Sequence, residues 1–473
     1  MPSAPQQRLD VDDVASHEGV DAATHAIPDS ARSGRLSLTM AWWGVCSALF
    51  YIFLAATLAT AYGTVNTIIA MVLTVVTYGL VNGLLARYAV GTGLSVALFS
   101  RVLFGRVGAL LATAIFSLTA IYYAIFEGSV IAVAASKVMG GLDYGTACII
   151  VVAYSVLLVF GSVQRFLDKL NGVLLPLYML GLVAAVVATV AKYGYSNAWL
   201  TFEPAGGASS TGWLQAYVAY MGVWVLMMFT FDYARFGARQ DVDYHARINF
   251  GIPFYVVTFL LNGLVGIFLI TSGAVAEVSE TGVVDQLLTV LGGWVALAFI
   301  WATQTRINSA NYYLATVNMQ AFFQRLGLSL AKGVWAVVVG VVVLVLMRAT
   351  DVFSYILNAL NYQGIFVTGW VAIAVTHILS PAYRRLFGDR VVYRAEDVPG
   401  LNPAGLAAWI AGAGLGLLMV LTGVGATWAP VVTVVVSAGL YAALLRFARR
   451  SWFERVAVGD QPLADRPEEP APA

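Results

Sequence analysis

The stretch Ala120-Ile121-Tyr122-Tyr123-Ala124-Ile125-Phe126-Glu127-Gly128 places one carboxylate among aromatic and aliphatic side chains. It lies within residues 106–137, an apolar segment longer than the ~20 residues needed to cross a bilayer. An ionised group at the bilayer centre costs roughly 2.5 to 3.5 kcal/mol, so such a group usually faces a bundle interior or a water-filled cavity. Glu127 is therefore either a structural residue, protonated or paired with another helix, or a binding site for a ligand or a proton.

The composition of the whole chain is that of an integral membrane protein. Of 473 residues, 60% are hydrophobic and 11% are charged, with a mean hydropathy of +0.81, whereas soluble domains are nearer half apolar and a quarter charged. Cys46 and Cys148 lie in unrelated apolar segments and indicate neither a disulfide framework nor a metal site. The near-neutral charge, without a basic face, argues against nucleic acid as a partner. The partners we expect are the lipid bilayer and a small-molecule substrate, with no obligatory protein partner.

Apolar segments predict twelve transmembrane helices between two polar tails. Residues 1–35 and those from about 457 to 473 are expected to be disordered, the latter within a cytoplasmic tail at 451–473. Residues 1–35 lack the pattern of a cleavable signal peptide. The expected spans are 37–62, 65–87, 108–137, 145–162, 172–192, 212–231, 250–274, 288–317, 333–347, 352–379, 404–422 and 429–446.

The charges between these spans predict the orientation of the chain. If the amino terminus is inside, most Lys and Arg residues fall in inner segments, and the outer ones hold only Lys137, Lys192 and Arg348. Cytoplasmic loops retain Lys and Arg. The sequence thus predicts a multi-pass protein of the plasma (inner) membrane with both termini cytoplasmic.

A short internal match points to an inverted repeat. Ala41-Trp42-Trp43-Gly44-Val45 in the first span has a counterpart in Ala219-Tyr220-Met221-Gly222-Val223 in the sixth, and Phe53 and Phe231 follow each match at the same distance. Many secondary transporters consist of two inverted halves. We therefore expect a first five-helix repeat at 36–200, a second at 201–380, and two further helices at 381–450.

Glycines in the matching helices have a possible use at a binding site. Gly44 and Gly222 allow a helix to unwind, or a ligand to approach the backbone, at little steric cost. A broken helix exposes backbone groups that hold ions and polar ligands. The alternative is close helix packing through small residues.

The eighth span contains the polar run Thr303-Gln304-Thr305-Arg306-Ile307-Asn308-Ser309-Ala310-Asn311. At 3.6 residues per turn, Gln304, Asn308 and Asn311 share one face, and their amides suit the edge of a heterocycle. Thr305, Asn308 and Ser309 offer oxygen ligands for a small hard cation. Arg306 has three alternatives: it pairs with Glu127, binds an anion, or stands in for a cation. Because Arg is effectively always protonated, it cannot carry a coupling proton.

Further motifs carry a resemblance to a known family. Gly91-Thr92-Gly93-Leu94-Ser95, followed by Ser100-Arg101-Val102-Leu103-Phe104-Gly105-Arg106-Val107-Gly108, resembles the Arg-x-x-Phe-Gly-x-x-Gly signature of the nucleobase-cation symporters, the group of purine-cytosine permeases and hydantoin or allantoin transporters. Phe231-Asp232-Tyr233-Ala234-Arg235-Phe236 and Asn311-Tyr312-Tyr313-Leu314-Ala315-Thr316 are similar to two further motifs of that family. The resemblance covers roughly residues 36–450.

The resemblance implies an all-α membrane fold of the leucine-transporter class: a five-plus-five inverted repeat with two extra helices. Substrate would lie between broken helices one and six and helices three and eight. Tyr123 would stack on the substrate, Glu127 would take the place of a polar residue that is often an amide, and Trp224 would replace the second stacking aromatic, which falls on Val223. The implied substrate set is Ser47, Tyr123, Glu127, Gly222, Trp224, Gln304, Asn308 and Asn311. The implied cation or coupling set is Gly44, Ala48, Glu127, Arg306 and Ser309, with Ser47, Gln304 and Asn308 nearby.

The function expected from these observations is secondary active import of a nucleobase or related heterocycle, such as cytosine, a purine, uracil, allantoin or hydantoin. Coupling would be to Na⁺ or H⁺, with no other cofactor. No nucleophile-base or metal constellation indicates an enzyme. The alternatives are a transporter of a different small nitrogenous metabolite and a cation-independent exchanger or sensor of the same fold.

Overall fold

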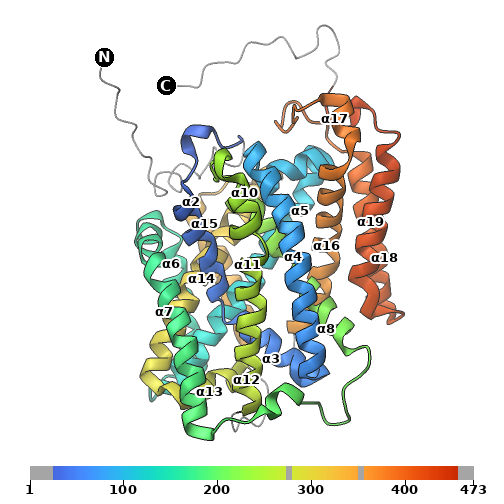
Figure 1. The fold of residues 1–473 in the computed structure, drawn as a ribbon. Helices are drawn as coiled ribbons and strands as arrows, with labels where there is room; N and C mark the ends of the chain where they lie inside the picture. Colours follow the sequence, from blue (N-terminus) through green and yellow to red (C-terminus); the bar gives the residue numbers. More distant parts are fainter. Residues whose placement is uncertain (1–24, 273–279, 350–355, 456–473) are drawn as a thin grey trace, which may run out of the picture.

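Long apolar runs fold into helices here, because backbone groups inside a bilayer must find their hydrogen-bond partners within their own segment. The computed structural model describes residues 25–272, 280–349 and 356–455, and within these ranges the chain is a helical bundle without a named strand (Figure 1). Its long helices are α4 (Thr64–Thr92), α5 (Val96–Val138), α6 (Tyr144–Leu158), α7 (Gly161–Tyr193), α14 (Gly293–Arg325), α15 (Lys332–Ala349), α16 (Ile356–Leu379), α18 (Pro403–Thr422) and α19 (Ala429–Leu445).

Ten helical segments of the described chain are long and apolar enough to cross a membrane. The expected fourth and eighth spans are not among them, because α6 has 15 residues and α14 contains the polar run. The described bounds otherwise follow the predicted spans, except that α5 and α7 begin at Val96 and Gly161, well before the expected starts at 108 and 172. The all-helical membrane fold is confirmed.

The first and sixth spans are both interrupted, and both interruptions fall at the predicted glycines. α2 (Arg35–Trp43) ends at Gly44, a 3₁₀ turn η2 (Gly44–Ser47) follows, and α3 (Phe50–Tyr62) begins after it. α8 (Gly212–Met221) ends at Gly222, and α9 (Val225–Ala234) begins three residues later. The two breaks leave backbone groups outside the regular helical pattern in the interior of the bundle.

The seventh span is less regular than its sequence indicates. It begins with the short turns η4 (Arg239–Asp241), α10 (Val242–Tyr244) and η5 (His245–Asn249), and continues through α11 (Ile252–Tyr255) and η6 (Val256–Leu261) into α12 (Asn262–Ser272). Both η5 and η6 are π-helical. Two short helices, α13 (Glu280–Leu291) and α17 (Pro381–Phe387), lie between spans.

The Phe104-Gly105 pair of the sequence signature forms a kink in α5. Gly105 has a φ of +80°, and a Cβ there would lie 2.8 Å from the backbone nitrogen of Asn402. That nitrogen donates to the Phe104 carbonyl at 2.9 Å. Only glycine combines a positive φ with such close backbone approach at low cost, so the signature positions the membrane-spanning part of α5 against the segment before α18.

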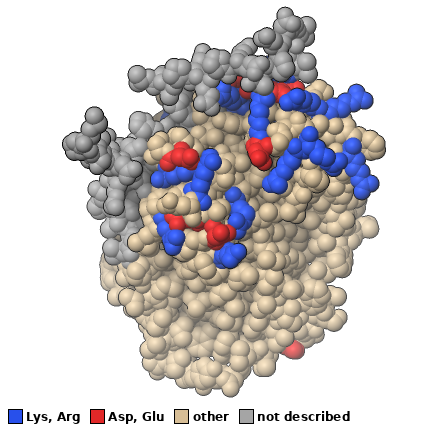
Figure 2. Space-filling view, turned by 45° about the horizontal axis from the view of Figure 1, so that its top comes forward, with Lys and Arg blue, Asp and Glu red and all other residues tan. Residues whose placement is uncertain are grey.

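Both ends of the described chain lie at the same end of the bundle, beside α10 and α17 (Figure 1). Ala26 N donates to the Tyr393 hydroxyl at 3.4 Å, and Arg455 N donates to the Asp397 carbonyl at 2.7 Å. Lys, Arg, Asp and Glu side chains gather over this end, while most of the visible flank is uncharged (Figure 2). We call it the charged end.

The first tail is shorter than expected. Residues 26–35, assigned to the disordered tail from sequence, are held to the bundle: Ile27 N donates to the Gly93 carbonyl at 3.0 Å, and Arg32 donates to the carbonyls of Val90 and Gly237 at 2.6 and 2.7 Å. The remaining tail residues, 1–24 and 456–473, lie outside the described residues.

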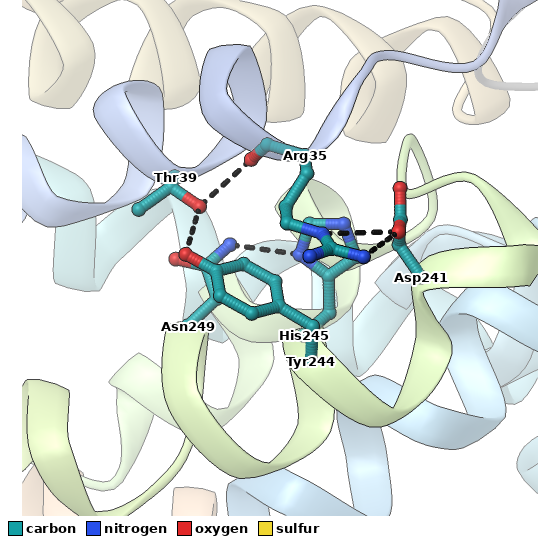
Figure 3. A network of polar contacts seen from close by, with 6 residues as sticks. All are labelled: Arg35, Thr39, Asp241, Tyr244, His245 and Asn249. Atoms are coloured by element: carbon teal, nitrogen blue, oxygen red, sulfur yellow. Dashed lines mark hydrogen bonds and ion pairs between the residues drawn. The ribbon is translucent and has the colours of Figure 1, made fainter.

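A polar network ties the start of α2 to the irregular seventh span (Figure 3). Arg35 pairs with Asp241 at 2.6 Å, and its guanidinium lies 4.9 Å from the centre of the Tyr244 ring. Thr39 and Tyr244 share a hydrogen bond of 3.1 Å between their hydroxyls. The buried His245 follows Tyr244 directly, and its Nδ1 lies 3.1 Å from Nδ2 of Asn249, one turn further along the chain. These contacts join α2 to the seventh span at the charged end.

Candidate functional site

A cavity lies where the two helix breaks face α5 and α14. Its wall combines residues around each break with residues from the middle of the two long helices. The lining residues are Val45, Ala48, Phe50, Tyr51, Tyr123, Glu127, Val223, Leu226, Phe229, Tyr233, Ile307, Ala310 and Asn311. Clefts of this kind, mostly apolar with a few convergent polar groups, are the usual form of a small-molecule site.

α5 contributes an aromatic ring and a carboxyl group one helical turn apart. Tyr123 is 8% exposed, and its ring meets that of Phe50 edge-on at 5.1 Å. Glu127 is 1% exposed, and its Oε2 has no hydrogen-bond partner among the described residues. Because buried polar groups are nearly always hydrogen-bonded, this carboxyl group is a candidate for contact with a ligand. The predicted pair Tyr123 and Glu127 thus lies together on one wall.

α14 contributes less of its polar run than expected. Asn311 lines the cavity beside Ile307 and Ala310. Asn308 is fully buried next to Gly128 of α5, and neither polar atom of its side chain has a described partner. Gln304 accepts a hydrogen bond from Leu49 N at 3.4 Å and so caps the start of α3. Of the three amides predicted to share a face, only Asn311 reaches the cavity wall.

The second break is held by α16. Gln363 donates to the Gly222 carbonyl at 2.8 Å, and its Nε2 also lies 3.5 Å from the Tyr123 hydroxyl. A Cβ on Gly222 would lie 2.5 Å from the Leu360 carbonyl, so glycine permits this close approach. Gly222 was predicted at the site from sequence, whereas Gln363 was not among the predicted site residues.

Trp224 lies apart from the cavity. Val223 lines the wall at this point, and the Trp224 ring packs edge-on against Tyr78 of α4 at 6.4 Å. The structure therefore does not bring Trp224 together with Tyr123 as an opposing ring.

The predicted cation residues gather at the first break, around a guanidinium. Arg306 donates to the Ser47 hydroxyl at 3.3 Å, and Ser47 donates to the Gly44 carbonyl at 2.7 Å. Ser309 donates back to the Arg306 carbonyl within α14 at 2.7 Å. Ala48 lines the cavity nearby. Arg306 therefore contacts the first helix break, where the family resemblance placed the cation site.

Solved structures with a similar fold are known. Mhp1, described as a nucleobase-cation-symport-1 family transporter, in a closed conformation with bromovinylhydantoin bound, matches at a TM-score of 0.70 and 15% identity over 91% of this chain and 97% of that one. Mhp1 in an inward-facing conformation matches at 0.72 and 16%, over 90% and 93%. The chain has the fold of Mhp1.

A manganese transporter from Eremococcus coleocola is a more distant match, at a TM-score of 0.55 and 14% identity over 87% of this chain and 94% of that one. No family model and no curated protein matches the sequence. The likeness to Mhp1 is thus one of fold, and it confirms the leucine-transporter-like architecture expected from sequence. The residue boundaries of the two repeats stay a prediction.

Within this Mhp1-like fold, the sequence analysis missed most of the aromatic lining. Phe50 and Tyr51 follow the first break directly, and Phe229 and Tyr233 lie one turn apart on α9 after the second. A usable signal was present, since both pairs follow a predicted break within about three helical turns. These rings extend the cavity from Tyr123 toward the carboxyl end of α9.

Proposed function

We propose that this chain is a secondary active transporter that imports a small, flat, nitrogen-containing heterocycle by alternating access. The observation that carries the proposal is the cavity between the two helix breaks, which the Tyr123 ring, the Glu127 carboxyl group and the Asn311 amide line together. Among the described residues, Glu127 Oε2 has no hydrogen-bond partner. Discontinuous helices that meet at a central site are the usual construction of secondary transporters.

The recognition chemistry fits a planar ring with polar edges. Stacking of a base on an aromatic side chain contributes about 1–3 kcal/mol in nucleic-acid complexes, and Tyr123 is the ring available for it. Glu127 accepts hydrogen bonds from N–H groups, and Asn311 both donates and accepts. Four residues of the expected substrate set do not line the cavity, and we place them next to its wall: Ser47, Gln304, Asn308 and Gly222. Trp224 is left out of the proposed site.

The candidate substrates are cytosine, uracil, purines, allantoin and hydantoin. Each offers N–H donors beside oxygen or ring-nitrogen acceptors on a flat or nearly flat ring, and Mhp1, which shares the fold, was solved with a hydantoin derivative bound.

A second candidate follows from the charge on the wall. A carboxylate without a described partner also suits a cationic nitrogenous metabolite, because a buried charge is stable only when it is paired. Glu127 would then hold the positive group of such a substrate, while Tyr123 contacts it through a cation–π interaction.

The experiment is counterflow exchange in proteoliposomes, which needs no driving gradient. We expect labelled cytosine, uracil, adenine, hypoxanthine or allantoin to exchange. Tyr123→Leu should reduce the exchange at least about fivefold, because loss of base–aromatic stacking costs about 1–3 kcal/mol. Tyr195→Leu, at a residue that is 62% exposed, is the matched control. Exchange of only cationic amines would favour the second candidate, and exchange of none of these compounds would contradict both.

We also propose that the charged end faces the cytoplasm of a plasma membrane. Lys and Arg side chains gather there (Figure 2), and cytoplasmic loops retain such residues. Both termini would then be cytoplasmic. A cysteine placed at Ala26 should react with an impermeant maleimide in inverted membrane vesicles and not in intact cells.

A further inference from the structure

A buried guanidinium lies beside the interruption of the first broken helix. Arg306 is 8% exposed and projects from α14 toward η2. A Cβ on Gly44 would lie 1.2 Å from Arg306 Nη2 and 1.7 Å from its Cζ, so the guanidinium fills the space directly beside the Gly44 backbone. In many transporters the backbone carbonyls of such an unwound segment coordinate a cation. In this chain the side chain of an arginine occupies that place.

The backbone carbonyls at this break already have donors. Ser47 Oγ donates to the Gly44 carbonyl at 2.7 Å, and Asn262 Nδ2 donates to the Cys46 carbonyl at 2.8 Å. The Val45 and Ala48 carbonyls accept from the backbone nitrogens of Ala48 and Tyr51 at 3.4 and 3.3 Å. Each of these four oxygens therefore already accepts a hydrogen bond within the protein.

The hydroxyl groups of α14 are directed elsewhere. Thr305 Oγ1 and the Tyr154 hydroxyl of α6 lie 2.9 Å apart, and Ser309 donates to the Arg306 carbonyl of its own helix. Hard cations require several oxygen ligands at once. Among the described residues near the break, the amide oxygen of Asn308 is the one such side-chain oxygen without a described partner. One oxygen does not make the several-ligand set that a sodium ion needs, so the groups present do not fit a sodium ion.

We propose that the Arg306 guanidinium permanently takes the place of a metal coupling cation at the contact between η2 and α14, so that transport by this protein does not use sodium. The proposal rests on the proposed function. A guanidinium is always protonated and repels a second cation placed beside it. It supplies the positive charge that holds the break against α14. Because this charge is part of a side chain, it does not cross the membrane with the substrate, and a sodium gradient cannot drive transport through this place.

The first test compares salts on the unmodified protein. Counterflow and net uptake of the exchanging compound are measured with sodium, potassium or choline chloride at equal ionic strength. We expect rates within about twofold of one another. A stimulation of fivefold or more that is specific to sodium would overturn the proposal.

A second readout does not depend on transport. Thermal unfolding of the purified protein is followed while sodium chloride replaces choline chloride. We expect no sodium-specific rise in Tm, because a ligand that binds only the folded state would raise it, and such a rise would overturn the proposal. If no compound exchanges in any salt, the proposed function fails while this measurement still decides the sodium question.

Variants then test whether the guanidinium is the group required. Arg306→Ser should lose at least tenfold in counterflow rate, and Arg306→Lys, which keeps a positive charge, should retain more activity than Arg306→Ser. Arg385→Ser, at an exposed arginine of α17, is the matched control. Unchanged, sodium-independent exchange in Arg306→Ser would overturn the role assigned to Arg306. Should Arg306→Ser fail to fold, the salt comparison on the unmodified protein remains decisive.

Discussion

Gln363 in α16 donates a hydrogen bond of 2.8 Å to the carbonyl of Gly222, the residue at which the second broken helix is interrupted. The same nitrogen lies 3.5 Å from the Tyr123 hydroxyl on the cavity wall. One amide side chain thereby connects α16, the break and the aromatic surface of the candidate site. A substitution at Gln363 should consequently change substrate binding even though Gln363 does not line the cavity.

Gln363→Leu should weaken substrate binding without abolishing transport. Loss of a hydrogen bond of this kind costs about 0.5–1.5 kcal/mol, which corresponds to an increase in KM of about 2- to 10-fold. The measurement is the concentration dependence of counterflow. Thr376→Val, which removes a hydroxyl bonded only within α16, should leave KM unchanged. An unaltered KM in Gln363→Leu would show that the link to Gly222 is purely structural.

Glu127→Gln should change which compounds bind. The substitution keeps the shape of the side chain but replaces an acceptor-only carboxylate with an amide that also donates. Hydrogen bonds to charged groups are worth about 1.5–3 kcal/mol, so competition by at least one compound should shift by about tenfold or more. Glu396→Gln, at an exposed loop position, is the control. An identical competition profile at every pH would return Glu127 to a structural role.

Gly44→Ala should destabilise the protein by displacing Arg306. The added methyl group would overlap the guanidinium, at 1.2 Å from Nη2, and overpacking of a buried site typically costs about 1–3 kcal/mol. The measurement is the Tm of the purified protein. In an Arg306→Ser background the same substitution should cost less, because the overlapping group is gone. Equal losses in both backgrounds would contradict direct contact between the two residues.

Arg35→Gln should loosen the charged end with little effect on stability. The ion pair with Asp241 is partly exposed, and such pairs contribute about 0.2–1 kcal/mol, so access to the cavity should rise by about 1.5- to 5-fold. The measurement is the rate of maleimide modification of Tyr233→Cys, at a cavity residue whose ring lies 5.4 Å from Trp42 of α2.

Arg87→Gln is the control for this prediction, because its partner Asp243 joins α10 to α4 instead of α2. The two native cysteines are buried, so their modification should be slow. An equal rise in both arginine variants would mean that α2 is not the element released.

The features predicted well from sequence are those set by local chemistry. Gly44 and Gly222 mark both breaks, because an interrupted helix needs a residue without a side chain where another element approaches closely. The ends of α18 and α19 were predicted to within a residue, since Pro403 and Pro430 lie at their starts and Gly423 follows α18. Proline at a helix start and glycine after its end are strong sequence signals.

The features missed depend on how a helix is rotated about its axis. Gln304, Asn308 and Asn311 do share a face of α14, but part of that face packs against α3 and α5, where Gln304 meets Leu49 and Asn308 lies beside Gly128. Spacing along one helix contains no information about that rotation. Trp224 and Val223 are neighbours in sequence, and tertiary packing against Tyr78 decided which of them faces the cavity.

The bonds that hold Ala26 and Arg455 bring both ends of the described chain to one loop, through Tyr393 and Asp397. Chains whose ends lie close together tolerate circular permutation. A short linker between these two positions would let new ends be opened in the exposed loop after α7, at Gly206-Gly207. Residues 207–455 would then be translated before residues 26–206, which would reveal whether either part of the bundle needs the other to insert first.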